Sequence, residues 1–219
     1  MRRLEPLQAA IVDLDGTMID TLGDFVVVLN RVLAELALAP VGRGFVEHAV
    51  GKGSEHLIRC TLQQVGAEAA LYERAWALYQ QHYAEVNGEH STVYPGVVEG
   101  LTLLKARGLR LACLTNKPTA FAQPLLRLKG LAGFFSAVFG GDAFERKKPD
   151  PLPLLKTCEA LGTAPAQTLM IGDSSNDARA ARAAGCPVVL MSYGYNHAEP
   201  VDAVDSDGVF DRLDRLAWS

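Results

Sequence analysis

The feature that most constrains this chain is a regular alternation of short apolar segments with helical segments. Five apolar runs predict buried strands, at residues 7–14, 109–115, 137–139, 168–171 and 187–191. Four helical patterns separate the later runs, at residues 97–105, 119–129, 151–161 and 176–184. Strands that alternate with helices of about 10–15 residues predict an α/β fold, with a parallel sheet and helices on both of its faces.

A helical block interrupts this alternation directly after the first strand. From residue 19 to about residue 87, apolar side chains recur at helical spacing, and no strand is predicted there. The chain is therefore expected to hold an α/β core of residues 1–18 and 92–219 and an all-α insertion of residues 19–91. Hinges between the two domains are expected near residues 17–21 and 88–94, where the pattern changes.

The charge and hydropathy of the chain exclude several classes of partner. Its 21 basic and 25 acidic residues sum to a net charge of −4, whereas a general nucleic-acid binder usually carries a basic stripe. No run of 18 apolar residues is present, so no membrane span is predicted. The basic start, Met1-Arg2-Arg3, is followed by an apolar segment that Asp13 interrupts, which is too short for a secretory signal. We therefore expect neither a nucleic-acid nor a membrane partner.

The four cysteines indicate a reducing compartment. Cys60, Cys113, Cys158 and Cys186 are far apart and form no Cys-x-x-Cys pair. A disulfide framework or a zinc site would space them tightly. We expect buried, reduced thiols in a cytoplasmic protein.

Polar side chains gather where the predicted strands end. Asp13 and Asp15 follow the first strand, Thr115 and Asn116 the second, and Asp173, Ser174 and Asp177 a later one. A single aspartate after a strand is usually a turn former or a helix cap. Because open α/β sheets bind ligands outside the carboxyl ends of their strands, several such residues together predict a site.

Four segments resemble the motifs of the haloacid dehalogenase superfamily, in its phosphatase form. In the family's order they are Asp13-Leu14-Asp15-Gly16-Thr17-Met18-Ile19-Asp20, the strand from Leu111 to Asn116, Lys148-Pro149-Asp150-Pro151, and Gly172-Asp173-Ser174-Ser175-Asn176-Asp177. The resemblance implies a doubly wound, Rossmann-like core and identifies the insertion as a cap over the active site. Helical caps belong to the phosphoglycolate phosphatase and phosphomutase branch. Gly194-Tyr195-Asn196 is similar to a short motif of the phosphoglycolate phosphatases.

Two carboxylates two residues apart suit the chemistry of this family. Asp13 is the candidate nucleophile, since a carboxylate can attack phosphorus and divide hydrolysis into two easier steps. Asp15 would protonate the leaving oxygen and then deprotonate the attacking water. Residues two apart along an extended chain begin on the same side, and the resemblance implies the same assignment.

Charge balance predicts a metal ion at this site. Asp13, Asp15, Asp173 and Asp177 would bring four negative charges beside a phosphate dianion, which requires compensation. Oxygen ligands and a phosphate suit Mg²⁺. Asp13 and Asp173 are the expected carboxylate ligands, and the resemblance adds the backbone carbonyl of Asp15. Asp177 would bind through water or hold the surrounding shell.

The remaining site residues would hold the phosphate. Lys148 is expected to offset charge on the transferred group, and it is preferred to Lys147 because it occupies the family position. Thr115 and the Asn116 amide would donate hydrogen bonds to phosphate oxygens. Gly16 would allow the backbone to approach the phosphate closely.

Within the cap, Gly51-Lys52-Gly53-Ser54 has two possible interpretations. It can be a plain turn between helices with Ser54 as a helix cap. Alternatively, the loop faces the active site and Lys52 binds an anionic group of the substrate. His56 and Arg59 are expected at the surface.

The leading hypothesis is a Mg²⁺-dependent phosphatase that acts on a small phosphorylated metabolite through an aspartyl-phosphate, with 2-phosphoglycolate as the expected substrate. One alternative is a sugar phosphomutase similar to β-phosphoglucomutase. Ser54-Glu55-His56 disfavours it, because that branch tends to carry an arginine there. The other is a phospho-acceptor module without enzymatic turnover, which the second carboxylate and the large lid disfavour. A monomer or a weak homodimer is expected.

Overall fold

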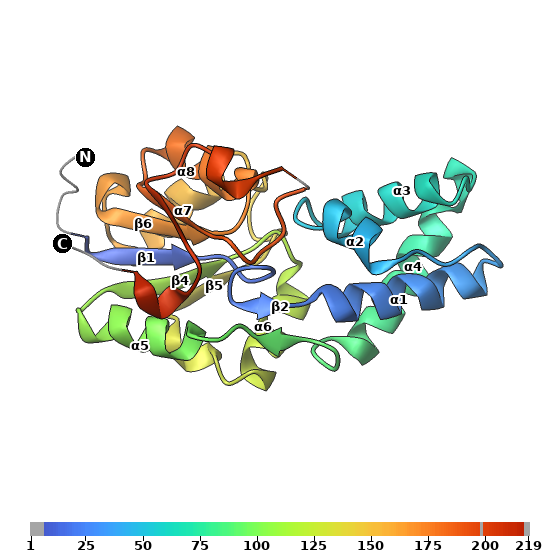
Figure 1. Cartoon of the computed structure of the whole chain (residues 1–219), viewed down its shortest axis with the longest axis horizontal. Coiled ribbons are helices and arrows are strands. Elements are labelled where there is room, and N and C mark those ends of the chain that lie inside the picture. Colours follow the sequence, from blue (N-terminus) through green and yellow to red (C-terminus); the bar gives the residue numbers. More distant parts are fainter. Residues whose placement is uncertain (1–6, 198, 217–219) are drawn as a thin grey trace.

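The computed structural model describes residues 7–197 and 199–216. Met1-Arg2-Arg3 and the outermost residues of the expected core therefore lie outside the described part of the chain. Figure 1 shows an α/β core with a helical domain projecting from one end of its sheet. No helix in the described ranges combines the length and apolar character needed to cross a membrane.

The core is built on a parallel sheet of six strands in the order β5-β4-β1-β6-β7-β8. The strands are β1 (Ala9–Val12), β4 (Arg110–Leu114), β5 (Ala137–Phe139), β6 (Thr168–Gly172), β7 (Val188–Met191) and β8 (Gly208–Phe210). The five predicted strands are confirmed. β8 is an addition: its three residues begin with a glycine, which is disfavoured in strands, and they lie between Asp207 and Asp211.

Helices cover both faces of this sheet, as the alternation predicts (Figure 1). Ala10 and Val12 of the central strand pack on the face covered by α5 (Val97–Ala106) and α6 (Thr119–Leu128). Ala9 and Ile11 pack on the opposite face, beneath α7 (Leu152–Leu161) and α8 (Ser175–Ala184). Because successive side chains of a strand point to opposite faces, a fully apolar β1 is explained by burial on both sides.

The inserted domain has a hydrophobic core of its own. Its helices are α1 (Leu22–Glu35), α2 (Arg43–Ala49), α3 (Ser54–Gln64) and α4 (Tyr72–Val86), with a short 3₁₀ turn at Ala69–Leu71. On facing helices, the rings of Phe25 and Tyr83 stack with centroids 5.5 Å apart. Phe121 and Tyr195 of the α/β core also join this cluster, so the cap is packed onto the core.

The junction between the domains corrects the expectation of a strand-free insertion. β2 (Ile19–Asp20) pairs with β3 (Thr92–Val93) as an antiparallel ribbon, with Ile19 opposite Val93. Two residues cannot show a periodic pattern. The ribbon forms only because the two segments that connect the domains lie side by side. Ile19 packs in the core cluster, whereas Leu22 already belongs to the cap cluster.

A buried carboxylate holds the segment of residues 88–91, which connects the cap back to the core. Asp24 of α1 is fully buried and accepts hydrogen bonds from the N–H groups of Gly88 (2.8 Å) and His90 (2.7 Å) and from the Ser91 hydroxyl. From the core side, Lys129 Nζ donates to the carbonyls of Gly88 (2.7 Å) and Ser91 (2.6 Å). The linker is therefore held by both domains.

We predict that Asp24→Asn destabilises the protein by about 1–3 kcal/mol, because one acceptor oxygen becomes a donor that faces other donors. Urea unfolding measures the change. Asp202→Asn, at an exposed carboxylate, is the control and should stay within about 0.5 kcal/mol of the parent chain. Equal effects of the two substitutions would contradict the role given to Asp24.

Candidate active site

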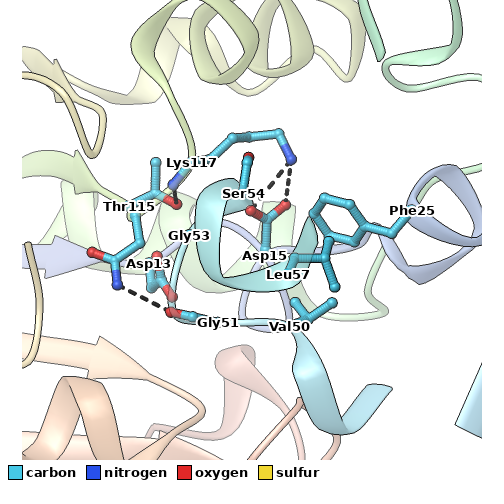
Figure 2. Close-up of a pocket in the computed structure, with 11 residues that line it drawn as sticks. Asp13, Asp15, Phe25, Val50, Gly51, Gly53, Ser54, Leu57, Thr115 and Lys117 are labelled. Atoms are coloured by element: carbon cyan, nitrogen blue, oxygen red, sulfur yellow. Dashed lines mark hydrogen bonds and ion pairs between the residues drawn. The ribbon is translucent and has the colours of Figure 1, made fainter. Parts of the chain in front are cut away.

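The polar residues at the strand ends do converge, at the edge of the sheet that faces the cap (Figure 2). The Asp13 N–H donates to the carbonyl of Ile171 at 2.9 Å and continues the β1–β6 pairing by one residue. A cavity between core and cap is lined by Asp13, Asp15, Phe25, Val50, Gly51, Gly53, Ser54, Leu57, Thr115, Asn116 and Lys117. Carboxylates, a hydroxyl, an amide and an ammonium thus face one space.

Lys148 lies between two carboxylates below this cavity. Its Nζ lies 3.0 Å from Asp13 Oδ1 and 2.7 Å from Asp177 Oδ1, and it donates to the Leu114 carbonyl at 2.9 Å. Burial lowers the pKa of Lys148, but Asp13 and Asp177 outweigh this and hold the pKa above its usual value. The ammonium therefore stays charged beside the candidate nucleophile.

The carboxylates themselves carry more negative charge than Lys148 neutralises. Burial raises the pKa of Asp13 to about 7; Lys148 opposes the rise, and Asp177 adds to it. Burial, together with Asp177 and Asp13, also raises the pKa of Asp173 well above its usual value. Buried carboxylates in this state favour either a proton or a metal cation.

Asp13, Asp173 and Asp177 are placed to hold such a cation. They are buried, and one oxygen from each lies within 4.8 Å of the others. Thr17 Oγ1 donates to Asp173 Oδ1 at 2.7 Å, and the Tyr195 N–H donates to Asp173 Oδ2 at 2.6 Å. These bonds orient Asp173, as outer-shell partners orient metal ligands.

Asp177 has other partners. Its Oδ1 contacts Lys148, and its Oδ2 accepts hydrogen bonds from the Ser174 N–H (3.2 Å), the Ser174 hydroxyl (2.8 Å) and the Asp173 N–H (3.3 Å). The bond from the Ser174 N–H is one half of the capping box of α8; in the other half the Ser174 side chain accepts from the Asp177 N–H. With both oxygens engaged, Asp177 is better suited to hold the loop than to bind a metal directly.

Two glycines make room for Asp173. A Cβ at Gly16, whose φ is +83°, would lie 2.3 Å from Asp173 Oδ2. A Cβ at Gly194 would lie 2.2 Å from the Asp173 Cβ. A close approach of the Gly16 backbone to phosphate stays a prediction, and the structure adds a second reason for glycine here: the missing side chain leaves space for the Asp173 carboxylate.

Tyr195, in the Gly194-Tyr195-Asn196 segment, links the same carboxylate to the cap. While its N–H binds Asp173, its hydroxyl donates to Asp20 Oδ1 and accepts from the N–H groups of Thr21 (3.1 Å) and Leu22 (3.2 Å). This connection between the acidic cluster and the first hinge was not predicted. The motif marked the segment, but the sequence does not reveal which partners it meets.

Thr115 and Asn116 both line the cavity, as the sequence predicts, but their side chains have different hydrogen-bond partners. Thr115 Oγ1 accepts from the Lys117 N–H at 3.2 Å, which leaves the hydroxyl proton free to donate. The Asn116 side chain donates to the carbonyls of Gly51 (3.0 Å) and Lys148 (2.9 Å) and accepts from the Lys148 N–H (3.1 Å). Because its side-chain amide is occupied, the predicted bond to phosphate falls to the backbone N–H.

The cap loop faces the site, which decides against a plain turn. Gly51 and Gly53 have φ values of +109° and +93° and line the cavity with Ser54. The Gly51 carbonyl also accepts from Asn176 Nδ2 at 3.3 Å. Lys52, by contrast, is exposed and is absent from the cavity lining. The helix cap is Gly53, and Ser54 is the first residue of α3.

The two other polar candidates of the cap lie nearer the surface, as expected. Arg59 is exposed and stacks its guanidinium 3.7 Å from the centre of the Tyr72 ring. His56 is half-buried, and its Nε2 lies 3.3 Å from the Cys60 sulfur. Neither residue lines the cavity.

Lys117 is the site residue that the sequence analysis missed. It is 4% exposed, and its Nζ donates to Asp15 Oδ1 at 2.9 Å and to the Tyr83 hydroxyl at 2.6 Å. Figure 2 shows the lysine reaching the Asp15 carboxylate beside the Phe25 ring. Its position directly after Thr115 and Asn116, at the end of a strand, was the available signal.

The fold agrees with the comparisons with known proteins. The model of the haloacid dehalogenase-like hydrolase family matches residues 10–191. The chain belongs to this family. The matched range includes Asp13, Asp173 and Asp177 and the whole of the inserted helical domain.

Relatives of this hydrolase match over nearly their whole length. A protein of Thiobacillus denitrificans named phosphoglycolate phosphatase is 44% identical over 97% of this chain and 95% of its own. A protein of the same name from Nitrosospira multiformis is 42% identical over 95% and 93%. A crystal structure from Haemophilus somnus, titled a predicted phosphoglycolate phosphatase, aligns with a TM-score of 0.91 at 34% identity, covering 95% of each chain.

We predict that Gly194→Ala lowers the hydrolysis of p-nitrophenyl phosphate by about 100-fold, since an ångström-scale displacement of Asp173 is enough for such a loss. Titration with MgCl₂ in a calorimeter should show weaker binding. Gly133→Ala is the control, because a Cβ there meets no atom within 4 Å. Unchanged activity and metal affinity in Gly194→Ala would show that Asp173 does not need this space.

Proposed function

We propose that this hydrolase is a Mg²⁺-dependent phosphoglycolate phosphatase that converts 2-phosphoglycolate into glycolate and phosphate. The observation that carries the proposal is the buried Asp13 carboxylate, 3.0 Å from the Lys148 ammonium and on the wall of a cavity that the cap covers. Asp15 lines the same cavity two residues further along. Two carboxylates therefore face one enclosed space, and a buried ammonium pairs with the first of them.

These residues can carry out phosphoryl transfer in two steps. An Asp13 oxygen attacks phosphorus, the bond to the leaving oxygen breaks, and an aspartyl-phosphate forms. Asp15 gives its proton to the leaving glycolate oxygen and then takes one from the water that releases phosphate. Lys148, held by Asp177, offsets the negative charge of the transferred group, and the Thr115 hydroxyl donates to one of its oxygens.

The acidic cluster fits Mg²⁺. Asp13 and Asp173 would bind the ion, together with the backbone carbonyl of Asp15, and Asp177 would support them. The donor set consists of oxygen atoms only, and the raised pKa values of Asp13 and Asp173 reflect uncompensated burial. The ion would supply the positive charge that keeps both carboxylates ionised beside a phosphate dianion.

The comparisons support this substrate. Two relatives that are 44% and 42% identical over nearly their full length carry the name phosphoglycolate phosphatase, which disfavours the phosphomutase alternative.

The deciding experiment measures phosphate release. We expect turnover of 2-phosphoglycolate with Mg²⁺, little with chelator, and much slower release from glucose 6-phosphate. Asp13→Asn should lower the rate by at least about 1,000-fold, because about 4 kcal/mol of barrier corresponds to that factor and a covalent step is lost. Asp202→Asn should have no effect. More than a tenth of the parent activity in Asp13→Asn would exclude Asp13 as the nucleophile.

The metal should stabilise the fold in a pH-dependent manner. Because the pKa of Asp13 is raised to about 7, this carboxyl is mostly protonated at pH 6 and mostly ionised at pH 8. Mg²⁺ must displace that proton, so its affinity rises with pH. Without metal, ionising this buried group costs stability as pH rises.

We therefore predict that 5 mM Mg²⁺ raises the melting temperature more at pH 8 than at pH 6, by several degrees if that concentration is about 100 times the dissociation constant. Asp173→Asn should remove most of the shift at both pH values. A shift of the same size at pH 6 and pH 8 would contradict the assignment.

We further propose that the protein works in the cytoplasm as a monomer or weak dimer. Cys113, Cys158 and Cys186 are buried and unbridged, which supports a reducing compartment.

A further inference from the structure

Lys117 has no part in the phosphoryl transfer described above. Among the described residues that line the cavity it is the one cation, against the two carboxylates of Asp13 and Asp15. It follows β4 and lies directly before Pro118, the residue that caps α6. A lysine that is 4% exposed is unusual, because burying an ammonium is costly unless hydrogen-bond acceptors or opposite charges replace the water around it.

Several groups contact this ammonium in place of water, and most of them belong to the cap. Its Nζ lies 2.9 Å and 3.3 Å from the two Asp15 oxygens and 2.6 Å from the Tyr83 hydroxyl. It also lies 4.6 Å and 4.7 Å from the ring centres of Phe25 and Tyr83, within cation–π range. The cation therefore sits where the closed cap meets the core.

The surroundings of Lys117 indicate what it could bind. The phosphoryl group of a substrate belongs at Asp13 and Lys148, so the rest of the molecule must extend toward the cap wall. That wall is formed by Phe25, Val50, Leu57, Ser54 and the backbone of the Gly51–Gly53 loop, none of which carries a charge. Lys52 of that loop is exposed outside the lining.

We propose that Lys117 binds the carboxylate of the substrate and thereby selects 2-phosphoglycolate over esters with an uncharged tail. An ammonium has three N–H donors, which here serve Asp15 Oδ1, Asp15 Oδ2 and the Tyr83 hydroxyl. The bond to Asp15 Oδ2, at 3.3 Å, is the longest of the three, so its N–H group can turn to a substrate carboxylate while Asp15 Oδ1 and Tyr83 stay bound. A bond between an ammonium and a carboxylate in an enclosed site is charge-assisted and strong. The inference rests on the proposed function and deepens it, since it assigns recognition to the core rather than to Lys52.

The kinetic test compares two substrates of similar size. Values of kcat/KM are measured with Mg²⁺ for 2-phosphoglycolate and for 2-hydroxyethyl phosphate, which has a neutral tail. In Lys117→Met, whose unbranched side chain can lie between the same rings, the value for 2-phosphoglycolate should fall about 10- to 100-fold more than the other. Lys156→Met removes an exposed lysine and should leave both values unchanged.

A binding test separates recognition from catalysis. 3-Phosphonopropionate carries a carboxylate where propylphosphonate carries a methyl group, and neither can be hydrolysed. Calorimetry should show that the parent chain prefers the carboxylate, and that Lys117→Met and Lys117→Gln remove this preference without weakening propylphosphonate binding. Melting temperatures show whether each variant folds. If Lys117→Met does not fold, Lys117→Gln alone provides the test.

Three results would overturn the inference. Equal losses of kcat/KM on both esters would mean that Lys117 positions Asp15. An unchanged preference between the two phosphonates would mean that it does not meet the carboxylate. Loss of preference in Lys52→Met, with Lys117→Met unaffected, would assign recognition to the cap loop. If the parent chain does not hydrolyse 2-phosphoglycolate at all, the proposed function itself fails, which is a distinct outcome.

Discussion

The arrangement of the active site depends on the ammonium of Lys148 between Asp13 and Asp177. Both carboxylates are buried at the end of a parallel sheet, where an unpaired charge would be costly. Lys148 compensates part of this charge and joins the loop after β1 to the first turn of α8. The capping box at Ser174 and the side chain of Asn116 then hold the two loops in which these charges lie.

The cap is attached through the same residues that organise the chemistry. Asn116 binds the Gly51 carbonyl of the cap loop as well as the Lys148 backbone. Tyr195 binds Asp173 with its N–H and the start of the cap with its hydroxyl. Lys117 joins Asp15 to Tyr83 of the cap. The packing of the cap on the core and the geometry of the carboxylates are therefore physically linked, and an enclosed site suits an enzyme that must exclude bulk water.

Much of this molecule could be predicted, for reasons visible in particular segments. The five predicted strands are apolar runs because the sheet is covered on both faces, and the helical insertion has a clear periodicity. β2 and β3 have only two residues each, and β8 begins with a glycine; these strands form where neighbouring segments pair with them. The sequence did not show that Gly16 also makes room for Asp173, 157 positions later in the chain.

The sequence by itself determined where the α/β core and the cap occur and which aspartates stand at the strand ends. Those features follow from periodicity and short spacings, which are local properties of the chain. Only the tertiary structure decided that Lys117 meets Asp15 and Tyr83, and that Gly51 rather than Lys52 faces the site. These contacts join segments that no local pattern connects, so they are set by how the cap packs on the sheet.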